Sequence, residues 1–235
     1  MNTFDYIFFD CMETLIDLEQ LPSIRDYAAW AYYGSGVEDL WEDFDEFFRY
    51  YLLAKQDIFS RLPEHADCEV YGRFLHIVKL SHPDIPYEVM ESTATILYKN
   101  YWSNYKSGSY IRKDVLQVLP QLKERYKMGV VSNFMVMGGI EEMLELHDIR
   151  KYFEFVVTSV AEGWMKPHTA IYKKALELAD TPPERIAFVG DDFINDYTAP
   201  SELGMTTVYL DRFDRHPELE RRVVDFTELR EMLLG

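Results

Sequence analysis

Residues 186–196 read Ile-Ala-Phe-Val-Gly-Asp-Asp-Phe-Ile-Asn-Asp. Positions 186–189 form an uninterrupted apolar run, which favours a strand that is buried on both faces, as in a parallel sheet. A glycine and two aspartates follow at once, and a third aspartate stands at position 196. In open α/β sheets the ligand lies beyond the carboxyl ends of the strands. Polar residues in this place therefore indicate a binding or catalytic site.

Four more short apolar runs in the chain end in polar residues. They occupy residues 6–9, 129–131, 155–158 and 206–210. Helical patterns lie between the later runs, at 115–126, 140–146, 169–179 and near 196–203. Alternation of strands and helices predicts an α/β fold, with a doubly wound, Rossmann-like parallel sheet.

The segment from 17 to 107 breaks this rhythm, because it has no convincing strand and is rich in aromatic residues at helical spacing. These include Trp30, Tyr33, Trp41, Phe44, Phe47, Phe48, Tyr51, Tyr98, Tyr101 and Trp102. We interpret it as an α-helical domain inserted after the first strand, with most of these rings forming its core. The predicted domains are therefore a sheet domain at 1–16 and 108–235 and a helical cap domain at 17–107.

Composition limits the function classes. The chain has 235 residues and a formal net charge of −17, which argues against a nucleic-acid partner but leaves room for a small phosphorylated substrate. Two cysteines, Cys11 and Cys68, make neither a disulfide framework nor a CxxC metal site. No apolar stretch reaches bilayer-spanning length, and no basic segment precedes the first strand. We expect a cytoplasmic protein that binds a small molecule and no membrane, and the sequence carries no signal for an oligomeric state.

Four motifs stand at the ends of these predicted elements. Asp10 follows the first strand, Ser132-Asn133 follows the second, Lys166-Pro167 precedes a helix, and residues 190–196 form the acidic run. This ordered set resembles the four motifs of the haloacid dehalogenase-like superfamily, in the group whose helical cap is inserted after the first motif. The resemblance covers the sheet domain from about residue 6 to residue 210, whereas the insert matches only in position and helical character.

The resemblance implies a hydrolase with Asp10 as covalent nucleophile and Mg²⁺ as cofactor. Asp10, Asp191 and the backbone carbonyl of Met12 would ligate the ion, and Asp192 or Asp196 would be a further ligand, direct or indirect. Elementary electrostatics supports a cation, because carboxylates crowded at adjacent strand ends repel one another. Mg²⁺ is a hard ion that few carboxylates, waters and a substrate oxygen can hold.

The resemblance also gives roles to the polar residues around the nucleophile. Lys166 would place its ammonium beside Asp10 and the phosphoryl oxygens, where it offsets negative charge. Ser132 would donate a hydrogen bond to the phosphoryl group, with help from backbone N–H groups around Asn133. Thr14 would brace the loop that carries Asp10, although a purely structural hydrogen bond is its alternative role.

One position departs from the family pattern. Most phosphatases of this superfamily have a second aspartate two residues after the nucleophile, as general acid and base, and here that residue is Met12. Methionine cannot transfer a proton, and general acid–base catalysis contributes about 10²–10⁴-fold in rate. Three explanations stay open: the leaving group needs no proton, the activity is weak, or another residue supplies the proton. The candidates for this last role are Glu13, His65, His76 and His82.

The sequence thus predicts a Mg²⁺-dependent phosphatase that acts on a small phosphorylated metabolite through an aspartyl-phosphate on Asp10. One alternative is a 2-haloacid dehalogenase, a class that also lacks the second aspartate and in which Arg49 could bind the halide or carboxylate. The acidic run at 190–196 argues against it, because dehalogenases resemble the pattern Ser-Asn-x-x-Asp there. The other alternative is a catalytically impaired binding protein with the same fold.

Overall fold

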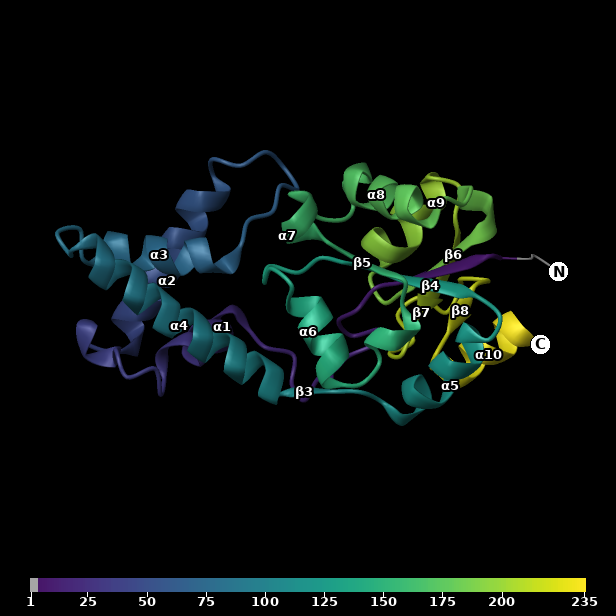
Figure 1. Cartoon of the computed structure of the whole chain (residues 1–235), viewed down its shortest axis with the longest axis horizontal. Helices are drawn as coiled ribbons and strands as arrows, with labels where there is room; N and C mark the ends of the chain where they lie inside the picture. Colours follow the sequence, from purple (N-terminus) through teal and green to yellow (C-terminus); the bar gives the residue numbers. More distant parts are fainter. Residues whose placement is uncertain (1–3) are drawn as a thin grey trace. The chain divides into compact units, whose positions relative to one another are not determined.

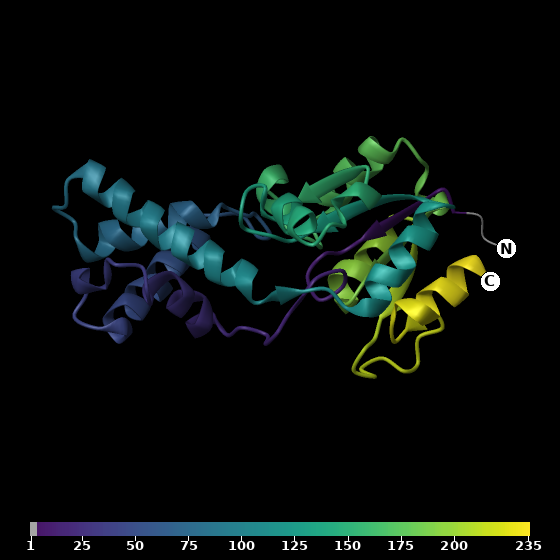
Figure 2. The same cartoon turned by 60° about the horizontal axis from the view of Figure 1, so that its bottom comes forward.

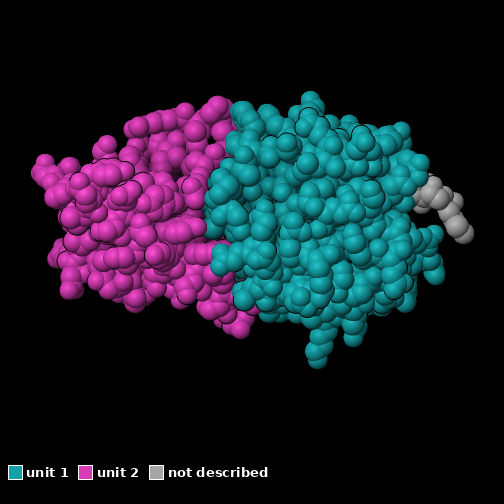
Figure 3. Space-filling view, in the orientation of Figure 1, with its two compact units in different colours: residues 1–18, 110–235 teal, residues 19–109 magenta. Residues whose placement is uncertain are grey.

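The computed structural model describes residues 4–235 and divides the chain into two compact units (Figure 3). The core unit comprises Met1–Leu18 with Tyr110–Gly235, and the insert unit comprises Glu19–Ser109. The boundaries expected from the sequence, after residues 16 and 107, each lie two residues from those of the structure.

The core unit contains a six-stranded parallel sheet in the order β5-β4-β1-β6-β7-β8 (Figure 1). Its strands are β1 (Tyr6–Phe9), β4 (Lys127–Ser132), β5 (Phe155–Thr158), β6 (Ile186–Gly190), β7 (Thr206–Leu210) and β8 (Arg222–Val223). The predicted parallel α/β sheet is confirmed. The edge strand β8 was not predicted, because two residues are too short to show a pattern.

Helices cover both faces of this sheet, with α8 and α9 on one side and α5, α6 and α10 on the other (Figures 1 and 2). The helical segments are α5 (Lys113–Lys123), α6 (Gly139–Leu146), η2 (Arg150–Tyr152), α7 (Ser159–Glu162), α8 (Thr169–Ala179), η3 (Pro183–Arg185), η4 (Phe193–Thr198), α9 (Ala199–Glu202) and α10 (Phe226–Leu234). Because helices cover both faces, the strands must be apolar on both sides, and all four residues of β1 are buried.

The central position of β1 organises the site edge of the sheet. Tyr6 pairs with Lys127 of β4 on one side and with Ile186 of β6 on the other. The residues that follow these three parallel strands therefore emerge side by side at the same edge of the sheet.

The insert unit is helical in its main elements. They are α1 (Ile24–Tyr32), η1 (Glu38–Leu40), α2 (Phe44–Phe59), α3 (Val70–Ser81) and α4 (Tyr87–Ser107). Ser23 starts α1 with a capping box that includes Asp26, and Asp43 caps α2, so polar side chains satisfy the free N–H groups of these helix ends. Short strands β2 (Asp17–Leu18) and β3 (Ser109–Tyr110) pair where the chain passes from one unit to the other.

Most of the aromatic residues expected in the helical core are buried, including Trp41, Phe47, Tyr51 and Tyr101, whereas Tyr33 is 58% exposed. No helix within residues 4–235 combines the length and the apolar character that a membrane crossing requires.

Candidate active site

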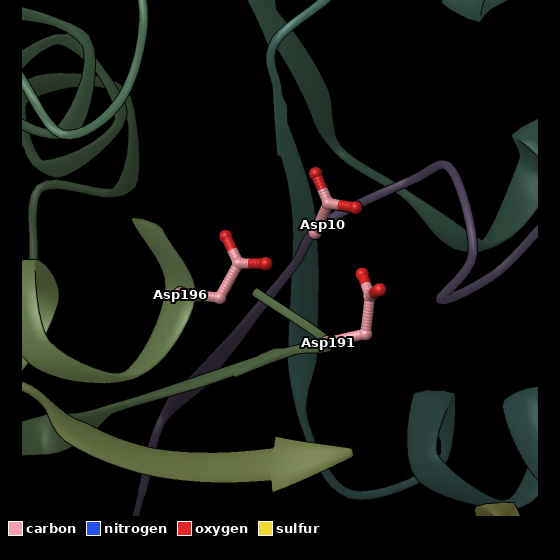
Figure 4. Close-up of side chains that lie close together, drawn as sticks. All are labelled: Asp10, Asp191 and Asp196. Carbon is pink, nitrogen blue, oxygen red and sulfur yellow. The ribbon is translucent and has the colours of Figure 1, made fainter. Parts of the chain in front are cut away.

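Three aspartates from separate segments meet at the edge of the sheet beyond β1 and β6. Asp10 follows β1 directly, Asp191 follows β6, and Asp196 lies in η4. Each offers a carboxylate oxygen, and these oxygens all lie within 4.8 Å of one another. Figure 4 shows the three carboxyl groups converging. They form the acidic cluster of the site, and one cation at its centre could contact all three residues.

Lys166 is the cation that the chain itself supplies to this cluster. Its side chain is 2% exposed, and Nζ donates to Asp10 Oδ1 at 2.7 Å, to Asp196 Oδ1 at 2.6 Å and to the Val131 carbonyl at 3.0 Å. An ammonium has three N–H donors, so all of them are used. Burial on its own would lower the pKa of Lys166, but the two carboxylates outweigh it and raise that pKa, so the lysine stays charged.

Asn133 fixes the backbone of Lys166. Its Oδ1 accepts from the Lys166 N–H at 2.6 Å, and its Nδ2 donates to the Lys166 carbonyl at 3.0 Å. Both functions of the amide side chain are thus directed at one peptide unit, so Asn133 positions the lysine. Ser132, the last residue of β4, is 1% exposed and lies one residue beyond Val131, whose carbonyl binds Lys166.

The acidic cluster holds more negative charge than Lys166 balances. Burial, reinforced by the charge of Asp10, raises the pKa of Asp191 to about 7. Burial also raises the pKa of Asp196 to about 8, in spite of the neighbouring lysine. Carboxylates with raised pKa values favour a proton or a cation, and an all-oxygen donor set suits Mg²⁺. The residues present therefore fit a divalent hard cation.

The two aspartates between which the sequence could not choose have different surroundings. Asp196 is 1% exposed, and its Oδ2 accepts from the Asp192 N–H at 3.1 Å while its Oδ1 binds Lys166. Asp192 Oδ1 accepts from the N–H groups of Ile194 and Asn195, so it caps η4. Asp196 thus belongs to the acidic cluster and already holds two protein donors, whereas Asp192 serves the backbone.

Gly190 allows this arrangement. A Cβ atom built on Gly190 would lie 2.4 Å from the carboxyl carbon of Asp196, far inside van der Waals contact. The carboxylate therefore occupies the space where any other residue would carry its side chain. The glycine before the acidic run is needed for close approach, rather than for an unusual backbone angle.

A tight loop carries the residues that follow Asp10. Glu13 has a left-handed backbone with φ of 60°, and the N–H groups of Leu15 and Ile16 both donate to the Cys11 carbonyl. Thr14 is fully buried and its hydroxyl donates to Asp191 Oδ1 at 3.3 Å. Thr14 thus connects this loop with the acidic cluster.

Met12 occupies the position of the expected general acid, and Glu13 follows it directly. Glu13 Oε1 accepts from the Leu18 N–H at 3.4 Å, and burial together with the charge of Asp17 raises the pKa of Glu13. The carboxyl group is therefore directed along its own loop toward β2. Met12 is partly buried and forms a backbone bridge with Ile16.

The three candidate histidines of the insert unit are each close to a polar neighbour within that unit. His76 Nε2 lies 2.6 Å from Asp57 Oδ2, His82 Nδ1 lies 2.8 Å from Ser81 Oγ, and His65 Nε2 lies 3.6 Å from Glu64 Oε1. His76 and His82 thus have hydrogen-bond partners inside the insert unit, whereas His65 has only a long approach to a glutamate.

Arg212 is a site residue that our reading of the sequence did not include. Its Nη1 donates to the Glu13 carbonyl at 2.6 Å and to Asp17 Oδ1 at 2.7 Å, and its Nη2 donates to the Thr14 carbonyl at 3.0 Å. The side chain is only 8% exposed, so these hydrogen bonds are shielded from water. Arg212 holds the loop that follows Asp10. Its position two residues after β7 was an available signal, since polar residues after strands were the ones to inspect.

Replacing Arg212 by Gln should lower kcat about 10–100-fold with a smaller change in KM, because a loop displaced by about 1 Å misplaces Asp10 without removing a substrate contact. Steady-state kinetics would measure the split, and Arg212→Lys should recover part of kcat. Arg215, which is exposed and stacks on Phe213, provides a matched control as Arg215→Gln. A fall in kcat that only follows the loss of folded protein would contradict a positioning role.

The chain is similar to known proteins in both sequence and fold. Residues 43–210 match the family model for haloacid dehalogenase-like hydrolases. Over 231 residues the chain is 28% identical to a glyceraldehyde 3-phosphate phosphatase of Pyrococcus furiosus, covering 97% of this chain and 89% of that protein. Over 79 residues it is 46% identical to haloacid dehalogenase-like hydrolase domain-containing protein 3 of Xenopus laevis, which covers 34% of this chain and 32% of that protein.

Among solved structures, a 2-haloacid dehalogenase from Pseudomonas syringae superposes with a TM-score of 0.76 at 18% identity, over 99% of both chains. At this identity the likeness concerns the fold alone. The family model spans most of the chain, and the fold and the ordered motifs agree with it. The chain belongs to the haloacid dehalogenase-like hydrolase family.

Proposed function

We propose that this protein is a Mg²⁺-dependent phosphatase that acts on a small phosphorylated metabolite through an aspartyl-phosphate on Asp10. The observation that carries the proposal is the buried constellation in which Lys166 bridges Asp10 and Asp196 while Asp191 stands beside them. It combines a carboxylate that can act as nucleophile with a fixed ammonium group. The three carboxylates carry more negative charge than this one ammonium neutralises, and a bound metal ion would balance the remainder.

The metal proposal assigns Asp10 and Asp191 as direct ligands, with the Met12 carbonyl as a third. Asp196 would act on the ion less directly, because Lys166 and the Asp192 N–H already bind its two oxygens. When bound, Mg²⁺ would neutralise charge on the phosphoryl oxygens and let an anionic substrate approach the acidic cluster.

In the first step Asp10 attacks phosphorus in line, so that an Asp10 O–P bond forms and the bond from phosphorus to the leaving oxygen breaks. Lys166 orients Asp10 through its hydrogen bond, and its charge stabilises the equatorial oxygens. Ser132 donates a hydrogen bond to one of these oxygens. The leaving oxygen departs without a proton from position 12, since Met12 has none to give.

In the second step a water attacks the phosphorus of the aspartyl-phosphate, which releases inorganic phosphate and regenerates Asp10. A base normally assists this water, and Met12 cannot do so. Both steps therefore favour substrates whose leaving group is a weak base, such as acyl phosphates, anhydrides and phenyl phosphates.

Two observations favour a phosphatase over a dehalogenase. The acidic cluster would repel a carboxylate substrate unless a metal ion were bound. Arg49, the candidate halide cradle, is 57% exposed, lies 3.7 Å from Glu46 and stacks over Tyr50 with 4.3 Å to the ring centroid. The relatedness to a protein named glyceraldehyde 3-phosphate phosphatase supports the same choice.

Hydrolysis of p-nitrophenyl phosphate with and without Mg²⁺ tests the proposal, because this leaving group needs no general acid. We expect chelation with EDTA to lower turnover at least about 100-fold, since charge neutralisation by the ion is worth several kcal/mol. Asp191→Asn should raise the Kd for Mg²⁺ at least about tenfold. Asp192→Asn, which preserves the helix cap, should leave it within about threefold.

The same assay has outcomes that contradict the proposal. Halide release from 2-chloropropionate without metal would establish a dehalogenase instead. Turnover that is indifferent to EDTA would exclude the metal assignment. Equal loss of Mg²⁺ affinity in the Asp191 and Asp192 variants would exclude the assigned ligand set.

A further inference from the structure

The insert unit contains a buried arginine whose charge has no carboxylate partner. Arg73 in α3 is 3% exposed. Its Nη1 makes a long hydrogen bond of 3.4 Å to the Tyr51 hydroxyl, and its buried Nε has no hydrogen-bond partner. No acidic side chain within residues 4–235 forms an ion pair with it. A buried guanidinium without a partner costs free energy, so its retention requires an explanation.

A second cation lies beside Arg73. Tyr51, Lys55 and Phe59 are spaced four residues apart on α2 and so share one face of that helix. The guanidinium of Arg73 lies 5.9 Å from the ring centroid of Tyr51 and 5.7 Å from that of Phe59. Lys55 lies midway between Tyr51 and Phe59 on this face of α2, and the charge of Arg73 acts on it. Burial and the charge of Arg73 both lower the pKa of Lys55, as expected for two cations that face one another.

The nearest acidic residue of α2 does not neutralise this pair. Asp57 is two residues from Lys55, which places it on another face of the helix. There its carboxylate lies 2.6 Å from His76 Nε2 and 2.6 Å from Arg61 Nη2. The chain has a net charge of −17, so acidic residues are plentiful, and two neighbouring cations without an acidic partner are unusual in it. No carboxylate within residues 4–235 forms an ion pair with either cation.

We propose that Arg73, Lys55 and the Tyr51 hydroxyl form a binding site for a small oxyanion within the insert unit. The planar guanidinium can donate parallel hydrogen bonds to a carboxylate, phosphate or sulfate, and Lys55 adds a point charge. The rings of Tyr51 and Phe59 shield the guanidinium from water, which strengthens its attraction for an anion. Lys55 is only partly buried, so its ammonium can be reached from the surface of the insert unit.

We commit this site to a free inorganic oxyanion, because every contact that defines it lies within the insert unit.

Thermal unfolding of the full chain in millimolar sodium sulfate, compared with sodium chloride at equal ionic strength, tests the site. The measurement is made with EDTA and without Mg²⁺, because the acidic cluster then repels anions and only the insert site can respond. We expect sulfate to raise the Tm by about 5 °C when the site is nearly saturated. No difference between the two salts would overturn the proposal, whether or not the protein proves to be a phosphatase.

Three variants locate the effect. Arg73→Met should abolish the sulfate shift and leave the Tm without anion unchanged or higher, because an unpaired buried charge is removed. Lys55→Met should also abolish the shift, and it decides the matter if the Arg73 variant fails to fold. Arg61→Gln, at a residue whose side chain is 71% exposed in the same unit, should keep the shift. A shift that survives in Lys55→Met would overturn the site.

Discussion

Asp10→Asn should reduce turnover of p-nitrophenyl phosphate at least about 10⁴-fold, because an amide cannot form the covalent intermediate. Asparagine has the same shape, so binding and fold should survive while the nucleophile is lost. Rapid-quench labelling with a substrate that carries radioactive phosphorus should give a stoichiometric phosphoenzyme in the unmodified protein and none in the variant. Because Met12 cannot assist the water of the second step, we expect this intermediate to accumulate.

Asp211→Asn is the matched control for Asp10→Asn. Asp211 also follows a strand directly and is 1% exposed, but it accepts backbone N–H groups from Arg215 and His216. Its replacement should change the Tm more than kcat. Turnover by Asp10→Asn near the unmodified level, or phosphoenzyme formed in that variant, would show that another residue is the nucleophile.

Lys166→Met should lower kcat at least about 10³-fold and also destabilise the fold by about 3–5 kcal/mol, since two buried carboxylates lose their counter-charge. Chemical denaturation would measure the free energy of unfolding, and the phosphatase assay would measure kcat. The two losses have separate origins. The stability loss comes from charge left without a partner, and the activity loss comes from the missing cation at the phosphoryl oxygens.

The double variant Lys166→Met with Asp196→Asn separates these origins. Removing one carboxylate together with the lysine should restore most of the free energy of unfolding that Lys166→Met loses, because less uncompensated charge is buried. It should not return kcat. Recovery of activity together with stability would mean that Lys166 acts through the fold alone and not on the reacting group.

The sheet and the place of Asp10 at its edge were predictable because their signals are local. An unbroken apolar strand followed by an acid is readable at Asp10 and at Asp191 without knowledge of any contact. The sequence could not show which of Asp192 and Asp196 joins the acidic cluster, since both follow the same strand. It depends on the space left by Gly190 and on the capping of η4, which are properties of the folded segment.

The contributions of Arg212 and Arg73 were hidden for a different reason. Each acts on residues far away in sequence: Arg212 on the loop at Glu13 and Thr14, and Arg73 on a face of α2. A single sequence does not show which residues an arginine will contact. Its burial, which is the informative property, exists only after the chain has folded.

The central position of β1 has a consequence for synthesis. Tyr6 pairs with Lys127 and Ile186, which lie 121 and 180 residues later in the chain. At roughly 5–20 residues per second, the ribosome takes about 6–24 s to deliver the first of these partners and about 9–36 s to deliver the second. During that time the apolar strand Tyr6–Phe9 stays unpaired, while the helices of the insert can already fold locally. The segment that carries Asp10 thus leaves the ribosome before the other strands of its sheet and is among the last to be enclosed. Chaperone binding to the nascent sheet domain is therefore most expected at this strand.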